Sequence, residues 1–400
     1  MDYISAYEAA EKWGVSPRQV QRLLAAGRIP CAKKHGRDYL IPANAVKPGD
    51  PRFERLERGE PFHKTPLSRE LTGVVTAINF HAPLADPDAI LDMAENRGAR
   101  VNFEMWFAYQ RGEFDRVKQL FSEIPADRAV KLISAGTAIA GAISSGDYPF
   151  FIEIETWLKT LLKADVNAEV KALAEHNLSI AYTGMIAHEM LPEWLKTGNF
   201  SALPNLFKPP AACTRMQYLI QLKDYAYTLA AAQTCLSLCG TENAIYDPDT
   251  RMRIYCAEAC FMTGREDAAK TYLRGAMKKS LPFGLITSFA ERLIPLGGLC
   301  ELLLKQEFPA HYDVIVNLGE SATKNWIDFH NRFTKDNIPL ILTPRDAQMA
   351  RLAAQGWSDK RIAEHFNLAP GTVKNIMDKI YDTLFISGGN RKKKLTKFIL

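Results

Sequence analysis

The last sixty residues of this chain follow a pattern that a compact set of short helices satisfies and an extended structure does not. Thr343 suits an N-cap and Pro344 the first position of a helix, which a glycine later stops. Ser358 is a second N-cap, for a short helix over residues 359–366. Asn367 then stands where a tight turn needs a left-handed residue, which asparagine tolerates.

A third helix begins at Pro370 and carries an apolar stripe on one side. The stripe, which we expect to pack inward, consists of Val373, Ile376, Ile380 and Leu384. Polar side chains remain at the N-terminal and outer part of the helix, the part that a helix-turn-helix presents to the major groove of DNA. The DNA-binding residues predicted in this segment are Lys360, Thr372, Val373, Lys374, Asn375 and Lys379.

These sixty residues resemble the C-terminal DNA-binding domain of LuxR-type transcription regulators. The resemblance rests on three segments at the family's spacing, which are Leu342 to Arg345, Lys360 to Glu364 and Thr372 to Lys374. It implies a four-helix DNA-binding domain over residues 338–400.

Three residues depart from the family's pattern: Arg361 replaces a glutamate, Ala369 a serine cap, and Ile376 a frequent histidine. The last two put individual contacts in doubt, not the fold. In the family, the region of the basic run Arg391–Lys394 begins a fourth helix that often serves dimerisation, which implies a homodimer. The run itself is either a solvated face or a phosphate contact.

The first fifty residues carry a second, independent helix-turn-helix pattern. A helix is predicted from Ala6 to Trp13, and Gly14 suits a left-handed turn after it. Ser16 then caps a second helix, with Pro17 at its first position. Gln19 lies three residues after the cap, which predicts a capping box.

A short basic hairpin is predicted to follow, from Cys31 to Ile41, with Gly36 at its turn. Helices and hairpin together resemble the winged domains of the excisionase and MerR-like group, over residues 1–48. The resemblance implies a recognition helix in the major groove and a wing on the backbone or in the minor groove. The alternative is a winged helix that binds proteins. The DNA-binding residues predicted here are Ser16, Arg18, Gln19, Arg22, Lys33, Lys34, Arg37 and Tyr39.

Charge is distributed unevenly along the chain, whose formal net charge is +5. Residues 1–70 hold 13 Lys+Arg and 9 Asp+Glu, residues 331–400 hold 13 and 6, and residues 71–330 hold 24 and 30. Basic ends around an acidic middle indicate that the ends meet phosphate. Residues 49–70, rich in charge and containing several prolines, are predicted to be a linker.

Residues 71–330 are predicted to form an almost entirely helical array. One stretch has tetratricopeptide-like spacing at Ala257, Cys260, Gly264, Ala269, Leu273, Ala276 and Pro282, and a second matches it at Ala108, Gly112, Phe114, Val117 and Phe121. Both lack the tryptophan that starts the pattern, so these are degenerate repeats. Such arrays also precede the LuxR-type domain in large regulators resembling the MalT group. The ATPase module of those regulators is not expected, because no glycine-rich phosphate loop occurs.

No cofactor, metal site or catalytic constellation is predicted. Cys235 and Cys239, like Cys256 and Cys260, are i, i+4 pairs that could together bind zinc or an iron–sulfur cluster. Because the second pair stands at repeat positions that expect small buried residues, packing is favoured over metal binding.

Together these patterns predict a mainly α protein with a winged helix-turn-helix, a tetratricopeptide-like array and a LuxR-type helix-turn-helix. We expect a bacterial, non-enzymatic transcription regulator that binds double-stranded DNA and senses a small-molecule or protein effector on its array. The lack of an export signal and of a long apolar run is expected of a cytoplasmic protein without a membrane span. Two alternatives are an excisionase-like accessory factor for recombination and a scaffold whose helix-turn-helix modules bind proteins.

Overall fold

The structure, a computed structural model, describes residues 3–36, 38–48, 91, 97–125, 129–239, 247–335, 342–384 and 386–395. The chain divides into two compact units, Met1–Arg58 and Gly59–Leu400, and each is described by itself. The predicted linker, residues 49–70, lies outside the described residues.

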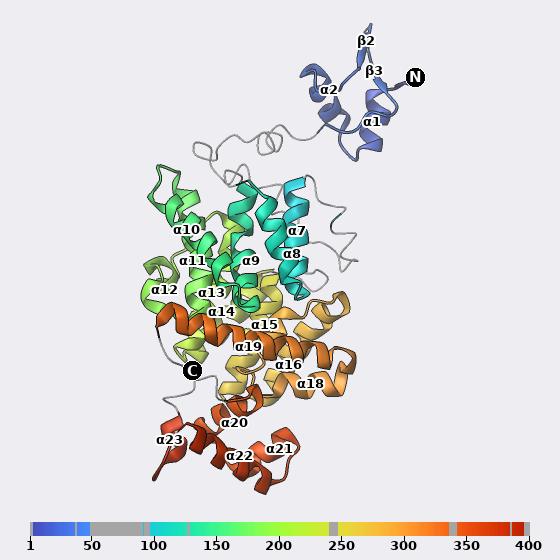
Figure 1. The fold of residues 1–400 in the computed structure, drawn as a ribbon. Coiled ribbons are helices and arrows are strands. Elements are labelled where there is room, and N and C mark those ends of the chain that lie inside the picture. Colours follow the sequence, from blue (N-terminus) through green and yellow to red (C-terminus); the bar gives the residue numbers. More distant parts are fainter. Residues whose placement is uncertain are drawn as a thin grey trace. The chain divides into compact units, whose positions relative to one another are not determined.

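The N-terminal unit contains two helices beside a small antiparallel sheet (Figure 1). Its elements are β1 (Tyr3–Ile4), α1 (Ala6–Lys12), α2 (Pro17–Ala25), β2 (Lys33–His35) and β3 (Asp38–Pro42). The strand order is β1-β3-β2, so the predicted hairpin of β2 and β3 is confirmed and β1 adds a third strand that the sequence did not predict. Small and branched side chains fill the core, including Ala9, Val20, Leu24, Ile29 and Ile41.

Helix α1 begins with a complete capping box, which was predicted for α2 instead. The Ser5 side chain accepts from the backbone N–H of Glu8, and the Glu8 side chain accepts from the backbone N–H of Ser5. At α2, the Ser16 side chain accepts from the backbone N–H of Gln19, which is the first half of such a box. Ser16 is therefore an N-cap as predicted, and the reciprocal bond belongs to Ser5.

The second unit is a stack of helices, and the predicted mainly α fold is confirmed (Figure 1). In the earlier part of this unit the described helices are α7 (Arg97–Gln110), α8 (Phe114–Glu123), α9 (Ala129–Ser145), α10 (Tyr148–Lys163), α11 (Ala168–Gly184), η1 (His188–Met190), α12 (Glu193–Thr197), η2 (Asn205–Phe207) and α13 (Lys208–Gln221). They are followed by α14 (Tyr225–Cys239), α15 (Asp247–Met262), α16 (Glu266–Ser280), η3 (Leu281–Phe283), α17 (Thr287–Ala290), α18 (Leu299–Glu307), η4 (Pro309–His311) and α19 (Tyr312–Thr334).

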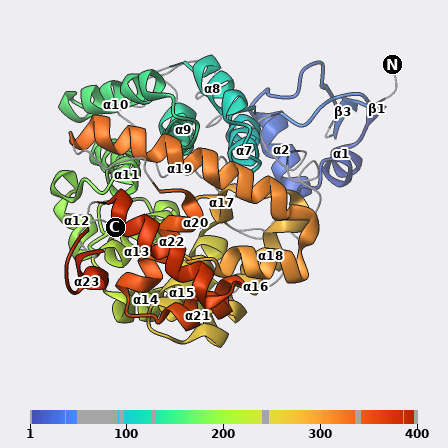
Figure 2. The same cartoon turned by 60° about the horizontal axis from the view of Figure 1, so that its bottom comes forward.

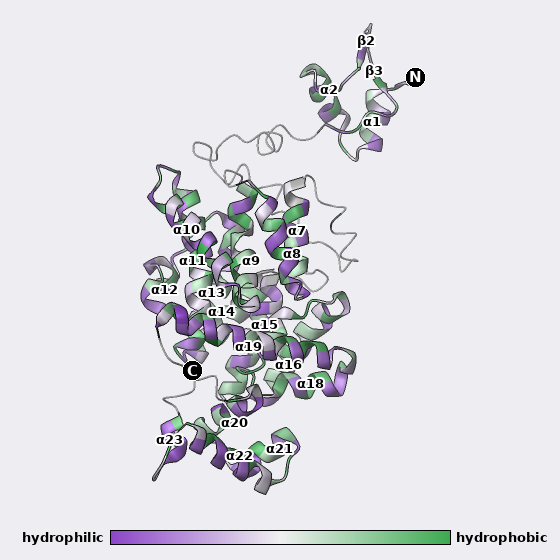
Figure 3. Ribbon diagram, viewed as in Figure 1, coloured by the Kyte–Doolittle hydropathy of each residue, from purple (hydrophilic) through white to green (hydrophobic). Residues whose placement is uncertain are grey.

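The two predicted repeat stretches both form helical hairpins. Gly112 joins α7 to α8 and Gly264 joins α15 to α16, at φ values of +77° and +76° that favour glycine. Ala257 and Ala269 are fully buried in the second hairpin, where their small side chains let the two helices approach. In Figure 3 hydrophilic and hydrophobic residues are mixed along α8 and α16, as expected of helices that bury one face. Helix α15 instead is buried without interruption from Ile254 to Phe261.

Helix α19 extends past residue 330, where the array was predicted to end, and packs against α9 and α17. Its Trp326 indole donates to the Gly184 carbonyl at 2.7 Å, and the Asn325 amide donates to the Ser144 carbonyl at 2.8 Å. This long helix therefore ties the early helices of the array to the late ones. Among the described helices, none combines the length and apolar character that crossing a membrane requires.

The C-terminal helices are α20 (Pro344–Ala354), α21 (Asp359–Phe366), α22 (Pro370–Thr383) and α23 (Arg391–Leu395), which face the viewer in Figure 2. Their predicted caps are confirmed: Thr343 and Ser358 cap α20 and α21, and Asn367 is left-handed at φ +53°. These helices share one hydrophobic cluster with the late array, in which the Trp357 ring lies 5.6 Å from the ring of Phe261. The residues predicted as a separate domain thus continue the core of the array.

Candidate nucleic-acid interfaces

Helix α22 presents a polar face above a buried one. Val373, Met377, Ile380 and Tyr381 are buried beneath it, and α21 packs alongside. The exposed residues of α22 include four that were predicted to bind DNA, which are Thr372, Lys374, Asn375 and Lys379. The structure therefore brings four predicted residues to one accessible face.

Val373 is the exception among the predicted DNA-binding residues of this helix, because its side chain is fully buried. Its burial indicates a packing role and argues against a direct contact of Val373 with DNA. Ile376, predicted to pack inward, is only partly buried, and Met377 takes the deeper position. Met377 lies four residues after Val373 and three before Ile380, so the helical spacing accommodates either residue in the stripe and does not decide between them.

Lys360 is exposed near the N-terminus of α21, next to the family departure at Arg361. The Arg361 guanidinium lies 3.6 Å from the centroid of the Trp357 ring, a close cation–π contact. The arginine thus covers an aromatic ring of the core, and the glutamate that it replaces could not do so.

The basic run of α23 is partly engaged within the domain. Arg391 pairs with Asp378 at 3.0 Å, and the Lys392 ammonium contacts Asp359 and the Trp357 carbonyl, each at 2.8 Å. Lys394 donates to the Ser387 carbonyl at 2.5 Å. These contacts fasten α23 to the other C-terminal helices, so the run has a structural role whichever of its two predicted readings holds. Residues 396–400 lie outside the described residues.

In the N-terminal unit, α2 exposes Arg18, Gln19 and Arg22, while Val20 and Leu24 are buried on its other side. The predicted division of this helix into a polar and an apolar face is what the structure shows. The Ser16 side chain forms the N-cap hydrogen bond and therefore lies beside the N-terminus of the helix.

On the hairpin, Lys33 and Lys34 are exposed and Tyr39 is partly buried directly opposite Lys34. The Lys33 ammonium lies 5.8 Å from the centroid of the Tyr3 ring. Arg37, predicted at the tip of the wing, lies outside the described residues. The wing therefore offers two lysines from one strand.

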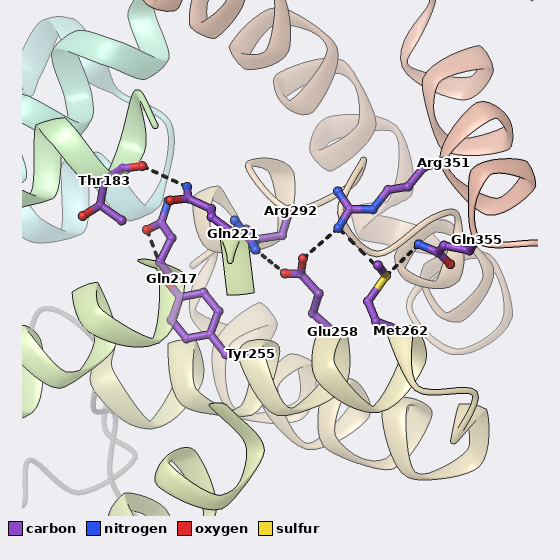
Figure 4. A network of polar contacts seen from close by, with 9 residues as sticks. All are labelled: Thr183, Gln217, Gln221, Tyr255, Glu258, Met262, Arg292, Arg351 and Gln355. Atoms are coloured by element: carbon purple, nitrogen blue, oxygen red, sulfur yellow. Dashed lines mark hydrogen bonds and ion pairs between the residues drawn. The ribbon is translucent and has the colours of Figure 1, made fainter. Parts of the chain in front are cut away.

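A buried ionic cluster joins the array to the C-terminal helices, and sequence reasoning missed it. Glu258 on α15, only 1% exposed, accepts from Arg292 and, at 3.2 Å, from Arg351 on α20 (Figure 4). Arg351 and Gln355 both also contact the Met262 sulfur. We call Glu258, Arg292 and Arg351 the Glu258 cluster. The sequence signal for it was a glutamate placed between the buried alanines Ala257 and Ala259.

A second contact holds α21 against a turn of the array. The His365 Nε2 atom donates to the Gly297 carbonyl at 2.6 Å, and burial lowers the pKa of His365. Gly297 and Gly298 have φ values of +56° and +88°, and a Cβ atom on Gly298 would stand 2.8 Å from Phe366. The glycine pair thus permits both the turn and the close approach of α21.

The predicted cysteine cluster is a packing feature where the structure describes it. Cys256 and Cys260 are buried, and burial raises the pKa of Cys256 to about 12. A thiol held so firmly protonated is a poor nucleophile and metal ligand. Cys239 contributes no described side chain, and among the described residues no group of three potential ligands gathers.

Comparison with known proteins supports this arrangement at both ends of the chain. Residues 340–387 match the domain family of bacterial regulatory proteins, luxR family. Residues 3–47 match a helix-turn-helix domain family. Both resemblances inferred from the residues are confirmed.

A relative also supports the resemblance of the middle. The HTH-type transcriptional regulator MalT of Vibrio campbellii is 25% identical to this chain over 232 residues. The match covers 52% of this chain and 24% of that protein, so the chain spans about a quarter of the relative's length. No solved structure matches the chain.

Proposed function

We propose that this chain is a transcription regulator that binds double-stranded DNA through α22, with α2 as a second reader. The observation that carries the proposal is the exposed polar face of α22, within residues that match a family of bacterial regulatory proteins. Lysines on such a face bind phosphate by releasing counterions, while Thr372 and Asn375 can read base edges. The regulator acts by binding and not by catalysis, in the bacterial cytoplasm where DNA is accessible.

The array has the role of a sensor in this proposal. It is the largest part of the chain, and its core is continuous with the DNA-binding helices. A change in the array can therefore reach α20 and α21 through packed side chains and through the Glu258 cluster. A homodimer on paired DNA sites would fit the same scheme, because one short luxR-family domain contacts only a few base pairs.

The DNA contact is tested on the full chain with Lys374→Ala/Lys379→Ala. A duplex is first selected from a random pool, and its affinity is then measured across a range of salt concentrations. Because each lysine–phosphate contact contributes about 0.9 to the slope of log affinity against log salt, removing two should flatten the slope by about 1.8. Lys278→Ala/Lys324→Ala is the matched control, since both lysines are exposed on the array. Equal slopes for the two double variants would refute the assignment of α22.

The second reader is tested with Arg18→Ala/Arg22→Ala on the same duplex. If α2 binds DNA, affinity falls and a shorter footprint remains over the site of α22. If α2 binds a protein instead, the footprint and the affinity for DNA alone stay as they are in the unaltered chain.

A further inference from the structure

A cavity of about 340 Å³ lies inside the second unit, between the array and the C-terminal helices. Its walls come from α9, α11, α13, α15 and α19, and Arg351 and Ala347 of α20 complete them. The greater part of the wall is apolar or aromatic and includes Ile143, Ile180, Ile254, Ile327, Tyr255 and Trp326. A space of this size and lining suits a small organic molecule.

The charged groups that line the cavity are predominantly basic. Lys223, Arg251, Arg292 and Arg351 face Glu258 and Glu291. Glu291 already accepts from the hydroxyl groups of Tyr109 and Ser144, at 2.7 and 2.6 Å, and Glu258 is shared by two arginines. Among the described residues that line the cavity, four thus carry a positive charge and two a negative one.

Arg292 supplies an independent observation at the cavity wall. Its Nε atom is buried and, among the residues that the structure describes, has no hydrogen-bond partner. Leaving a buried donor without a partner is unfavourable, because the donor has lost its hydrogen bonds to water. An anionic oxygen in the cavity would satisfy it, because a guanidinium binds a carboxylate or a phosphate through parallel N–H donors.

We propose that this cavity binds a small organic anion, with a carboxylate or phosphate head at Arg292 and an apolar or aromatic body against the isoleucines. The inference rests on the proposed function, since it names the chemistry that the array would sense. Arg251 also lines the cavity, near the N-terminal end of α15, and its guanidinium lies 5.9 Å from the centroid of the Tyr109 ring. In the proposal it is a second positive group for the anionic head.

The anion would also bear on the DNA-binding helices. Arg292 belongs to the array and Arg351 to α20, and Glu258 already bridges them (Figure 4). A second anionic group beside the pair offsets their surplus charge and strengthens the attachment of α20 to the array. By linkage, any change in DNA affinity that the anion causes equals the change in anion affinity that DNA causes.

Calorimetry on the full chain, without DNA, tests the site with chosen probes. The anions are phenylacetate, indole-3-acetate and phenyl phosphate, and the neutral controls are phenylacetamide and indole-3-acetamide. We expect at least one anion to bind about tenfold or more tightly than its uncharged counterpart. Comparing the affinity of phenyl phosphate with that of phenylacetate shows whether the arginines prefer a phosphate or a carboxylate head group.

Three variants locate the binding. Arg251→Gln and Arg292→Lys should each weaken the best anion about tenfold, and Arg292→Lys keeps a positive charge beside Glu258 while removing the Nε donor. Arg332→Gln, on an exposed pair outside the cavity, should bind as the unaltered chain does. If Arg292→Lys fails to fold, as judged by circular dichroism and gel filtration, Arg251→Gln decides the matter.

The proposal is overturned if no anion binds more tightly than its neutral control, or if the folded cavity variants bind like Arg332→Gln. Duplex binding by the same samples is measured separately. If the chain binds the anion but no duplex, the proposed regulator function is refuted and the cavity proposal stands. If it binds the duplex but no anion, the cavity proposal is refuted and the regulator function stands.

Discussion

Replacing Glu258 by glutamine removes the carboxylate that two buried arginines share. Arg292 and Arg351 are 16% and 13% exposed in their side chains, so neither can turn to water without moving a helix. Breaking a buried ion pair on one side costs about 3–5 kcal/mol, because a charge is left uncompensated. We expect Glu258→Gln to lower the stability of the packed helices by an amount in this range.

Arg351→Gln should lower stability less than Glu258→Gln does, because Glu258 keeps Arg292 as its partner. The loss is that of one hydrogen bond between charged groups, about 1.5–3 kcal/mol. Since Arg351 comes from α20 and Glu258 from α15, the loss falls on the attachment of the C-terminal helices. The double variant should cost less than the sum of the two single ones, because both remove the same contact.

Hydrogen exchange followed by mass spectrometry measures this attachment locally, which suits a chain of several parts that need not unfold in one step. A change of 1.4 kcal/mol is tenfold in an equilibrium constant, so exchange in α20 should accelerate about tenfold to a hundredfold in Arg351→Gln. Arg332→Gln, whose partner Asp328 is 53% exposed, is the control with about 0–1 kcal/mol. Equal exchange in α20 for the two variants would show that the Glu258 cluster does not fasten the C-terminal helices.

Three further outcomes test other parts of the fold. Gly298→Ala places a Cβ 2.8 Å from Phe366 at a φ of +88°, so it should destabilise the docking of α21 by more than about 1 kcal/mol, seen as faster exchange there. Arg361→Ala should lower the stability of the C-terminal helices by about 0.5–1 kcal/mol in urea unfolding, through the lost contact with Trp357. Burial lowers the pKa of His176 from 6.5 to about 4, so its neutral form favours folding and stability is lost as pH falls between those values. His176→Gln should flatten this part of the pH profile of the unfolding midpoint, and an unchanged profile would contradict the assignment.

Local signals in the sequence predicted the helices at both ends well. Thr343, Ser358 and Asn367 act through their own neighbours, so their caps and turns can be inferred from a few residues. The same holds for Gly112 and Gly264 in the hairpins of the array. The misplaced capping box shows the limit: Ser5 and Ser16 both suit a cap, and only the glutamate at position 8 makes the reciprocal bond.

Contacts between distant segments could not be predicted in the same way. Glu258 and Arg351 are separated by 93 residues, and nothing in the helical period of either segment indicates that they meet. The predicted boundary before residue 338 rested on the resemblance of the C-terminal domain, which describes that domain by itself. The buried contacts of Trp357 and His365 with the array join segments that are far apart in the sequence.

That packing changes how a signal can reach DNA in this chain. A reader on a flexible tether responds only to its local concentration, whereas α20 and α21 here lie on the same core as the cavity. The exposed residues of α22 lie on the side of the helix away from that core. Under the proposed function, DNA bound there would leave the contacts of α20 and α21 with the array in place. We propose that an effector alters how firmly α20 is held, and with it the position of the lysines on α22, without releasing the DNA-binding helices from the array.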